Sequence, residues 1–108
     1  MKLPTEIFGD VAVVHTPDEL NGDQADNVML FLTTLEQSKV IVDLDGTESI
    51  DSQGLTLLLE ANDKLVDSSG ALKIATTNPV NRKILEITRL DQQLDVFDSV
   101  IDAVKSFV

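Results

Sequence analysis

The sequence contains no cysteine, which excludes disulfide bonds, thiolate metal ligands and a cysteine nucleophile. It has neither tryptophan nor tyrosine and only four phenylalanines, so it offers little aromatic surface on which bases or sugars could stack. Its apolar runs are too short to span a bilayer, and Lys2 is not followed by the apolar segment of a signal peptide. These absences predict a soluble, cytoplasmic protein.

Basic residues are also scarce: eight Lys and Arg accompany 19 Asp and Glu, for a formal net charge of −11. Such a surface repels phosphate backbones and anionic lipid, which argues against nucleic-acid and membrane-surface binding. The acidic surface favours a protein partner with a basic contact face. The alternative is that the charge serves solubility alone, which would explain the same composition.

Strand patterns recur along a chain whose length suits a single domain over residues 1–108. Two apolar runs flank Gly9-Asp10, which predicts an antiparallel β-hairpin. The β-branched run 40–44 is typical of a strand covered on both faces, as in parallel sheets, and further short strands are predicted at 72–75 and 94–97.

Helical patterns alternate with these strands. They cover about 24–35 and 52–67, and two further helices are predicted, one capped by Asn78 with Pro79 as its first residue and one capped by Asp98 or Ser99. The inner helix faces are predicted to carry Ala25, Val28, Leu32 and Leu35; Leu55, Leu58, Leu59, Leu65 and Val66; Val80, Ile84 and Ile87; and Val100, Ile101, Val104 and Phe107. The predicted fold is α/β, with a mostly parallel mixed sheet, an antiparallel N-terminal hairpin strand, a loop over 15–23 and about four helices.

The sequence Asp-Ser-Gln-Gly at 51–54 lies where a strand has ended and a helix begins. The simplest interpretation of Ser52 is a helix N-cap. Gly54 has no packing role visible in the pattern and costs about 1 kcal/mol relative to Ala, which indicates close approach by another backbone. A phosphate on Ser52 would be locally tolerated, because a helix N-terminus has unpaired N–H groups and a positive partial charge.

Three stretches share one wider pattern. The strand ending in Asp43-Leu44 is followed by the turn 51–55, Asp-Ser-Gln-Gly-Leu, and a leucine-rich helix, with Asp-Glu-Leu-Asn at 18–21 and Arg-Lys-Ile-Leu at 82–85. Over essentially its whole length the chain resembles the STAS domain, the family of anti-sigma factor antagonists and of related domains in sulfate transporters. It differs from the family pattern at Gln53, usually Ser or Thr, and within 18–21, where Asp18 replaces Gly and Asn21 replaces Asp.

The resemblance implies a regulatory function rather than an enzymatic one. The family's switch residue is the serine directly after the Asp, here Ser52, which a serine-kinase anti-sigma factor phosphorylates. The unphosphorylated form binds that kinase and frees a sigma factor, and the phosphorylated form is released. The resemblance implies no cofactor, leaves weak purine-nucleotide binding and homodimer formation open, and indicates a partner site formed by Asn21, Asp51, Ser52, Gln53 and Gly54.

The magnitude of such a switch is modest. Phosphorylation adds about −1.5 to −2 charge to a turn that in the sequence already holds Asp45, Glu48 and Asp51. A hundredfold loss of affinity requires about 2.7 kcal/mol, which lies within the usual range of coupling energies between sites. One modification therefore suffices without refolding.

Two alternatives remain open. One is an adaptor of the same fold that is not phosphorylated, either a scaffold in a sensory assembly or a small partner of a transporter ATPase. The other is an enzyme, but His15 is the only histidine and the sequence contains no Gly-x-Ser-x-Gly. The stretch 43–46, Asp-Leu-Asp-Gly, lacks the spacing and the final Glu of a calcium loop. The sequence therefore predicts neither a catalytic nor a metal site.

Overall fold

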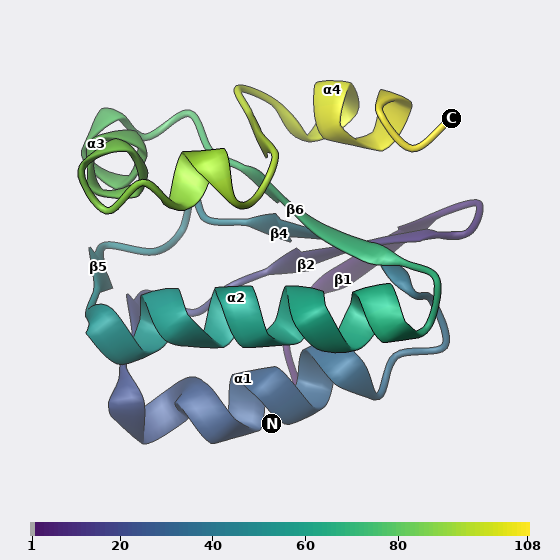
Figure 1. The fold of residues 1–108 in the computed structure, drawn as a ribbon, viewed down its shortest axis with the longest axis horizontal. Helices are drawn as coiled ribbons and strands as arrows, with labels where there is room; N and C mark the ends of the chain where they lie inside the picture. Colours follow the sequence, from purple (N-terminus) through teal and green to yellow (C-terminus); the bar gives the residue numbers. More distant parts are fainter. Residues whose placement is uncertain (1) are drawn as a thin grey trace.

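Strands and helices alternate in the computed structural model, which describes residues 2–108 (Figure 1). The strands are β1 (Thr5–Phe8), β2 (Val11–His15), β3 (Glu19–Leu20), β4 (Lys39–Asp43), β5 (Ser49–Ile50), β6 (Ala71–Ala75) and β7 (Val96–Phe97). The helices are α1 (Gly22–Thr33), α2 (Ser52–Asp67), α3 (Pro79–Ile87) and α4 (Val100–Lys105), and a 3-10 helix η1 (Leu90–Gln92) follows α3.

Five strands form the main sheet in the order β1-β2-β4-β6-β7. The β1–β2 pair is the antiparallel hairpin, and every other pair in this sheet is parallel. The predicted α/β class, the mixed sheet and the four helices are therefore confirmed. A second, two-stranded parallel sheet joins β3 to β5, so the segment predicted as a loop before α1 contains a short strand.

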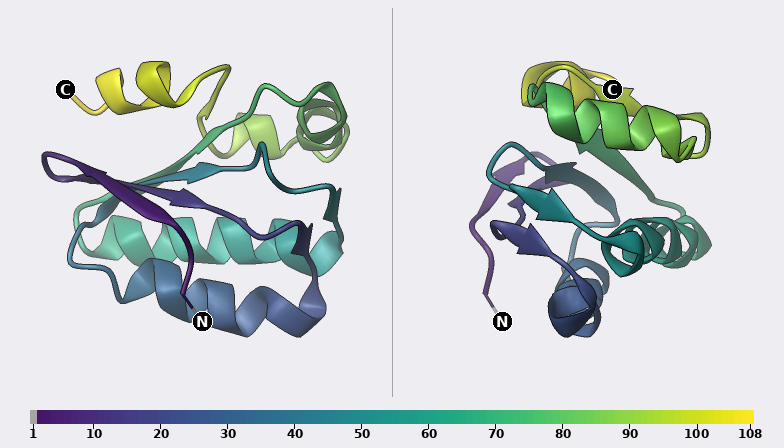
Figure 2. Two further views of the ribbon diagram at one scale, coloured as in Figure 1. Left: turned by 180° about the vertical axis from the view of Figure 1, so that it is seen from behind. Right: turned by 90° about the vertical axis from the view of Figure 1, so that its left-hand side faces the viewer.

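Helices cover both faces of the main sheet (Figures 1 and 2). On β4, Val40 and Val42 belong to the core that α1 and α2 complete, whereas Ile41 faces the smaller cluster under α4. All three side chains are fully buried, as the continuous β-branched run predicts. Within residues 2–108, no helix has both the length and the apolar character needed to cross a membrane.

The predicted inner face of α3 is wrong at two of its three positions, since only Ile84 is half-buried. Val80 and Ile87 are 62% and 70% exposed, whereas Asn81 and Leu85 are buried. The helix turns its asparagine inward because the Asn81 amide donates to two backbone carbonyl oxygens in the connection between β4 and β5, at 2.9 and 3.1 Å. Buried carbonyl groups need such donors, and this need outweighs the burial of two apolar side chains.

Two other helix faces differ from the prediction in single positions. Val66 in α2 and Ile101 in α4 are expected to point inward, yet they are 53% and 66% exposed. Leu57 and Ala103 take the inner positions instead. Both helices carry apolar residues on more than one face, and only the packing of the sheet decides which face is buried.

Candidate functional site

Two helix N-termini meet beside the small β3–β5 sheet. β3 leads into Asn21, the N-cap of α1, and β5 leads into Asp51, the N-cap of α2. The two strands pair in parallel with Leu20 opposite Ile50, and the N–H of Asp51 donates to the Leu20 carbonyl at 3.2 Å. The small sheet thus places the two caps, 30 residues apart in the sequence, next to each other.

The Asp51 carboxylate connects these two helix starts. Its Oδ1 accepts a hydrogen bond from the N–H of Gly54 at 2.9 Å, and its Oδ2 accepts from the N–H of Gly22 at 3.3 Å. Each bond satisfies an N–H group that a helix N-terminus leaves without an intrahelical partner. Asn21 caps its own helix by accepting from the N–H of Asp23 at 3.0 Å.

Ser52 is the first residue of α2 and not its N-cap, so the simplest interpretation from sequence is wrong. Asp51 takes the capping role, and the Ser52 side chain is exposed. The Ser52 carbonyl accepts from the Thr56 hydroxyl at 2.8 Å. Its own hydroxyl makes no hydrogen bond within residues 2–108 and is accessible from solvent.

Gly54 lies beneath the backbone of β3. A Cβ atom at this position would overlap the Leu20 carbonyl oxygen and would lie 3.2 Å from Cγ2 of Ile50. The sequence predicts close approach of another backbone at Gly54, and the structure shows that this backbone belongs to the chain itself. Glycine therefore allows β3 to cross the first turn of α2.

Gln53 packs against the start of α1. A Cβ atom on Gly22 would overlap the amide at the flexible end of the exposed Gln53 side chain, which would then have to move aside. Gln53 also borders a shallow polar hollow whose other lining residues are Asn21, Gly22, Asp23 and Asp51. The hollow thus brings together three of the five residues predicted for partner binding, Asn21, Asp51 and Gln53, whereas Ser52 and Gly54 do not line it.

The chemistry of this hollow is that of an acceptor surface. Its lining holds two carboxylates and two side-chain amides but no lysine or arginine. The nearby Glu19 carboxylate accepts from the Asn21 amide at 3.4 Å. In the described part of the chain, no three His, Asp or Glu side chains are grouped to hold a metal ion. The hollow therefore suits N–H donors of a partner.

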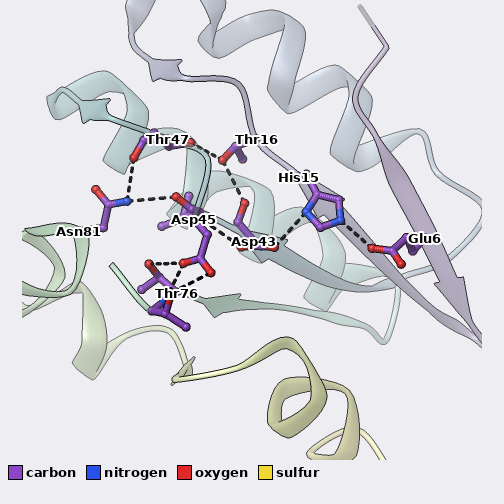
Figure 3. A network of polar contacts seen from close by, with 10 residues as sticks. Glu6, His15, Thr16, Asp43, Asp45, Thr47, Thr76 and Asn81 are labelled. Carbon is purple, nitrogen blue, oxygen red and sulfur yellow. Dashed lines mark hydrogen bonds and ion pairs between the residues drawn. The ribbon is translucent and has the colours of Figure 1, made fainter. Parts of the chain in front are cut away.

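His15 lies between two carboxylates at the end of β2 (Figure 3). Its Nε2 contacts Oε1 of Glu6 at 2.7 Å, and its Nδ1 contacts Oδ2 of Asp43 at 2.9 Å. The hydrogen bond to Glu6, together with the charge of Asp43, raises the pKa of His15 although partial burial opposes this. His15 thus links β1, β2 and β4 through these side chains.

Asp45 is engaged by the connection between β6 and α3 (Figure 3). Its carboxylate accepts from the N–H of Thr77 at 2.6 Å, from the Thr77 hydroxyl at 3.0 Å and from the Thr76 hydroxyl at 3.1 Å. Partial burial opposes ionisation, but these donors outweigh it and lower the pKa of Asp45. Asp45 is therefore an acceptor that holds the connection between β6 and α3 against the end of β4.

Known proteins share this fold along the whole chain. A protein of Thermotoga maritima whose name places it among the anti-sigma factor antagonists is 26% identical over 106 residues, which cover 94% of each chain. The crystal structure of a T. maritima protein of the same description has a TM-score of 0.85 at 23% identity and covers 96% of this chain and 92% of that one.

A second solved structure, the anti-sigma factor antagonist SpoIIAA of Bacillus, has a TM-score of 0.79 in its unphosphorylated form and 0.72 in its phosphorylated form. The identities are 16% in both cases, and the alignments cover 98% and 99% of this chain and 96% and 100% of SpoIIAA. The model of the STAS domain family matches residues 2–103. The chain belongs to the STAS domain family.

Proposed function

We propose that this protein is a cytoplasmic anti-sigma factor antagonist that binds a serine-kinase anti-sigma factor and is released when Ser52 is phosphorylated. The observation that carries the proposal is the position of Ser52, an exposed serine with a free hydroxyl in the first turn of α2. The name of the T. maritima relative and the two phosphorylation states in which SpoIIAA has been solved support it.

The surroundings of Ser52 suit a phosphoacceptor. A kinase can reach the hydroxyl because the side chain is exposed and makes no hydrogen bond to residues 2–108. The N-terminus of α2 tolerates negative charge through its partial positive charge. Asn21, Asp51 and Gln53 line the adjoining hollow, where the kinase would dock while its active site faces Ser52.

Release follows from electrostatics at close range. A kinase that phosphorylates Ser52 must hold the phosphates of its nucleotide beside that hydroxyl. Once the phosphate is transferred, about −1.5 to −2 charge on Ser52 faces the nucleotide phosphates and the nearby Asp51. Like charges in a partly desolvated interface repel strongly. A loss of about 2.7 kcal/mol lowers the affinity a hundredfold.

The test uses the serine-kinase anti-sigma factors of the source genome, each purified and mixed with this protein and ATP. Mass spectrometry is expected to find phosphate at Ser52, and none on Ser52→Ala. In biolayer interferometry, Ser52→Ala should bind the kinase with the wild-type dissociation constant, and Ser52→Asp should bind about a hundredfold more weakly. Ser99→Asp, which keeps a capping residue at the start of α4, is the matched control and should bind like wild type.

Equal binding of Ser52→Ala and Ser52→Asp would refute the switch. If no kinase phosphorylates Ser52 and the protein instead co-purifies with a transporter ATPase or a sensory scaffold, the chain is a non-phosphorylated adaptor. These outcomes separate the proposal from the alternative that the sequence leaves open.

A further inference from the structure

A groove of about 230 Å³ lies between α1 and α2, next to the hollow at the two helix N-termini. Apolar residues that are buried or half-buried line it, namely Ala25, Met29 and Leu57. The exposed carboxylates of Asp26 and Glu60 also line it, one from each helix. Gln53 borders both the groove and the hollow, so the two form one continuous surface.

The charge of this surface is one-sided. α1 contains no lysine or arginine, and Lys64 is the only basic residue of α2. Within residues 2–108, neither Asp26 nor Glu60 forms an ion pair with a basic side chain. Both carboxylates are therefore solvated in the free protein and available to a partner.

These two features together select one kind of occupant. An apolar side chain of the partner would gain about 1.5–3 kcal/mol by entering the apolar part of the groove. A neutral or acidic segment would remove water from the Asp26 and Glu60 carboxylates without supplying hydrogen-bond donors in its place. The free energy of this desolvation exceeds the gain from burying the apolar side chain. A segment that carries Lys or Arg beside its apolar side chain pairs with both carboxylates as it docks.

We propose that the α1–α2 groove is a second contact of the kinase interface and binds an apolar side chain flanked by Lys or Arg. The inference rests on the proposed function and names the chemistry of the partner surface. Gln53, which differs from the usual family residue, lies where this contact meets the one around Ser52. Its long amide side chain contributes to partner selection because a partner that reaches both contacts must pass over it.

The test compares two groove variants with wild type against the purified kinase. Ala25→Leu fills the groove with a good helix former, and Glu60→Lys reverses one of its charges. Each should weaken kinase binding about tenfold, because the first blocks the apolar side chain and the second repels its basic neighbours. Asp91→Lys in η1 makes the same charge change at an exposed site with no ion pair in residues 2–108, and should bind within about twofold of wild type.

Salt provides an independent readout. Wild-type affinity should fall between about 50 and 500 mM NaCl because salt screens exposed charge pairs, and the slope should be smaller for Glu60→Lys. A kinase that binds wild type and loses affinity for Ser52→Asp, yet binds Ala25→Leu and Glu60→Lys like wild type, would overturn the groove proposal and leave the switch intact.

A kinase panel that does not bind the wild-type protein would instead count against the proposed function. The groove is then tested by NMR with an acetylated Lys-Leu-Leu-Arg amide peptide and its Glu-Leu-Leu-Glu counterpart. The amide signals of Asp26, Met29 and Glu60 should shift in a saturable way with the basic peptide and not with the acidic one. The Glu60→Lys variant should not show these shifts. This result would support the groove proposal. Shifts elsewhere, or none, would overturn it.

Discussion

Replacing Gly54 by alanine tests how closely β3 crosses the first turn of α2. Helix propensity alone predicts that the substitution stabilises the protein by about 1 kcal/mol, because glycine is the poorer helix former. The structure predicts the opposite sign. The new methyl group would overlap the Leu20 carbonyl oxygen and lie 3.0 Å from its carbonyl carbon.

The backbone at Leu20 cannot move away cheaply. Its side chain is fully buried, β3 pairs with β5, and its carbonyl accepts the Asp51 N–H at 3.2 Å. Forcing a methylene-sized group into such packing costs about 1–3 kcal/mol, and losing the hydrogen bond adds about 1 kcal/mol. After subtracting the gain in helix propensity, we expect a net loss of about 2 kcal/mol.

Thermal unfolding followed by circular dichroism measures this loss. For a domain of this size, about 2 kcal/mol lowers Tm by roughly 8–15 °C. Gly46→Ala is the matched control, because a Cβ there would meet only the Thr16 carbonyl oxygen, at an ordinary 3.8 Å. That variant should melt within about 3 °C of wild type. A Gly54→Ala protein that melts at or above the wild-type temperature would refute the close approach.

Two further predictions concern ionisable side chains away from Ser52. The pKa of His15 is raised from 6.5, so its ion pairs with Glu6 and Asp43 stabilise the fold fully below about pH 6.5 and are lost as the pH rises through the folded-state pKa. The urea midpoint of wild type relative to His15→Gln should therefore fall as the pH rises above about 6.5, and a constant difference would contradict the ion pairs. The pKa of Asp45 is lowered from 3.8. Asp45→Asn should therefore lower the free energy of unfolding by about 1 kcal/mol at neutral pH, because an asparagine forms weaker hydrogen bonds to Thr77 than the carboxylate does. That cost should shrink as the pH falls through the folded-state pKa, and equal urea midpoints at pH 7 would contradict it.

The main elements could be predicted because their signals are local. The bounds predicted for α2, 52–67, match the structure since an acidic N-cap precedes the helix and Ser-Ser-Gly follows it. α1 begins two residues earlier than predicted, at Gly22, because Asn21 caps it from within a segment that was expected to be loop.

The remaining features depend on contacts between distant parts of the chain. β3 and β5 have two residues each, too few for any alternation, and exist because they pair with each other. The inward turn of Asn81 is set by carbonyl groups 34 and 37 residues away, at Thr47 and Leu44. No periodicity in α3 could reveal acceptors that only the tertiary fold brings near.

The site shows the same division between local and distant information. The motif identified Ser52 and its neighbours, but the capping role of Asp51 and its bond to Gly22 require the pairing of β3 with β5. That bond also bears on the proposed phosphorylation of Ser52. Both Asp51 oxygens already accept from N–H groups at helix N-termini, so under the proposed function we expect a phosphate on Ser52 to leave these two bonds in place.

In the proposed interface, binding and release therefore depend on different residues. Under the two proposals, the groove around Asp26 and Glu60 would attract basic groups whatever the state of Ser52, while Ser52 would face a kinase site that holds nucleotide phosphates. A phosphate there opposes like charge at a few ångströms, where Coulomb energies at a protein surface reach about 4 kcal/mol per charge pair. This exceeds the roughly 2.7 kcal/mol that a hundredfold release requires. The attraction at the groove can thus be strong enough for binding and still yield to one phosphate, with no change of fold.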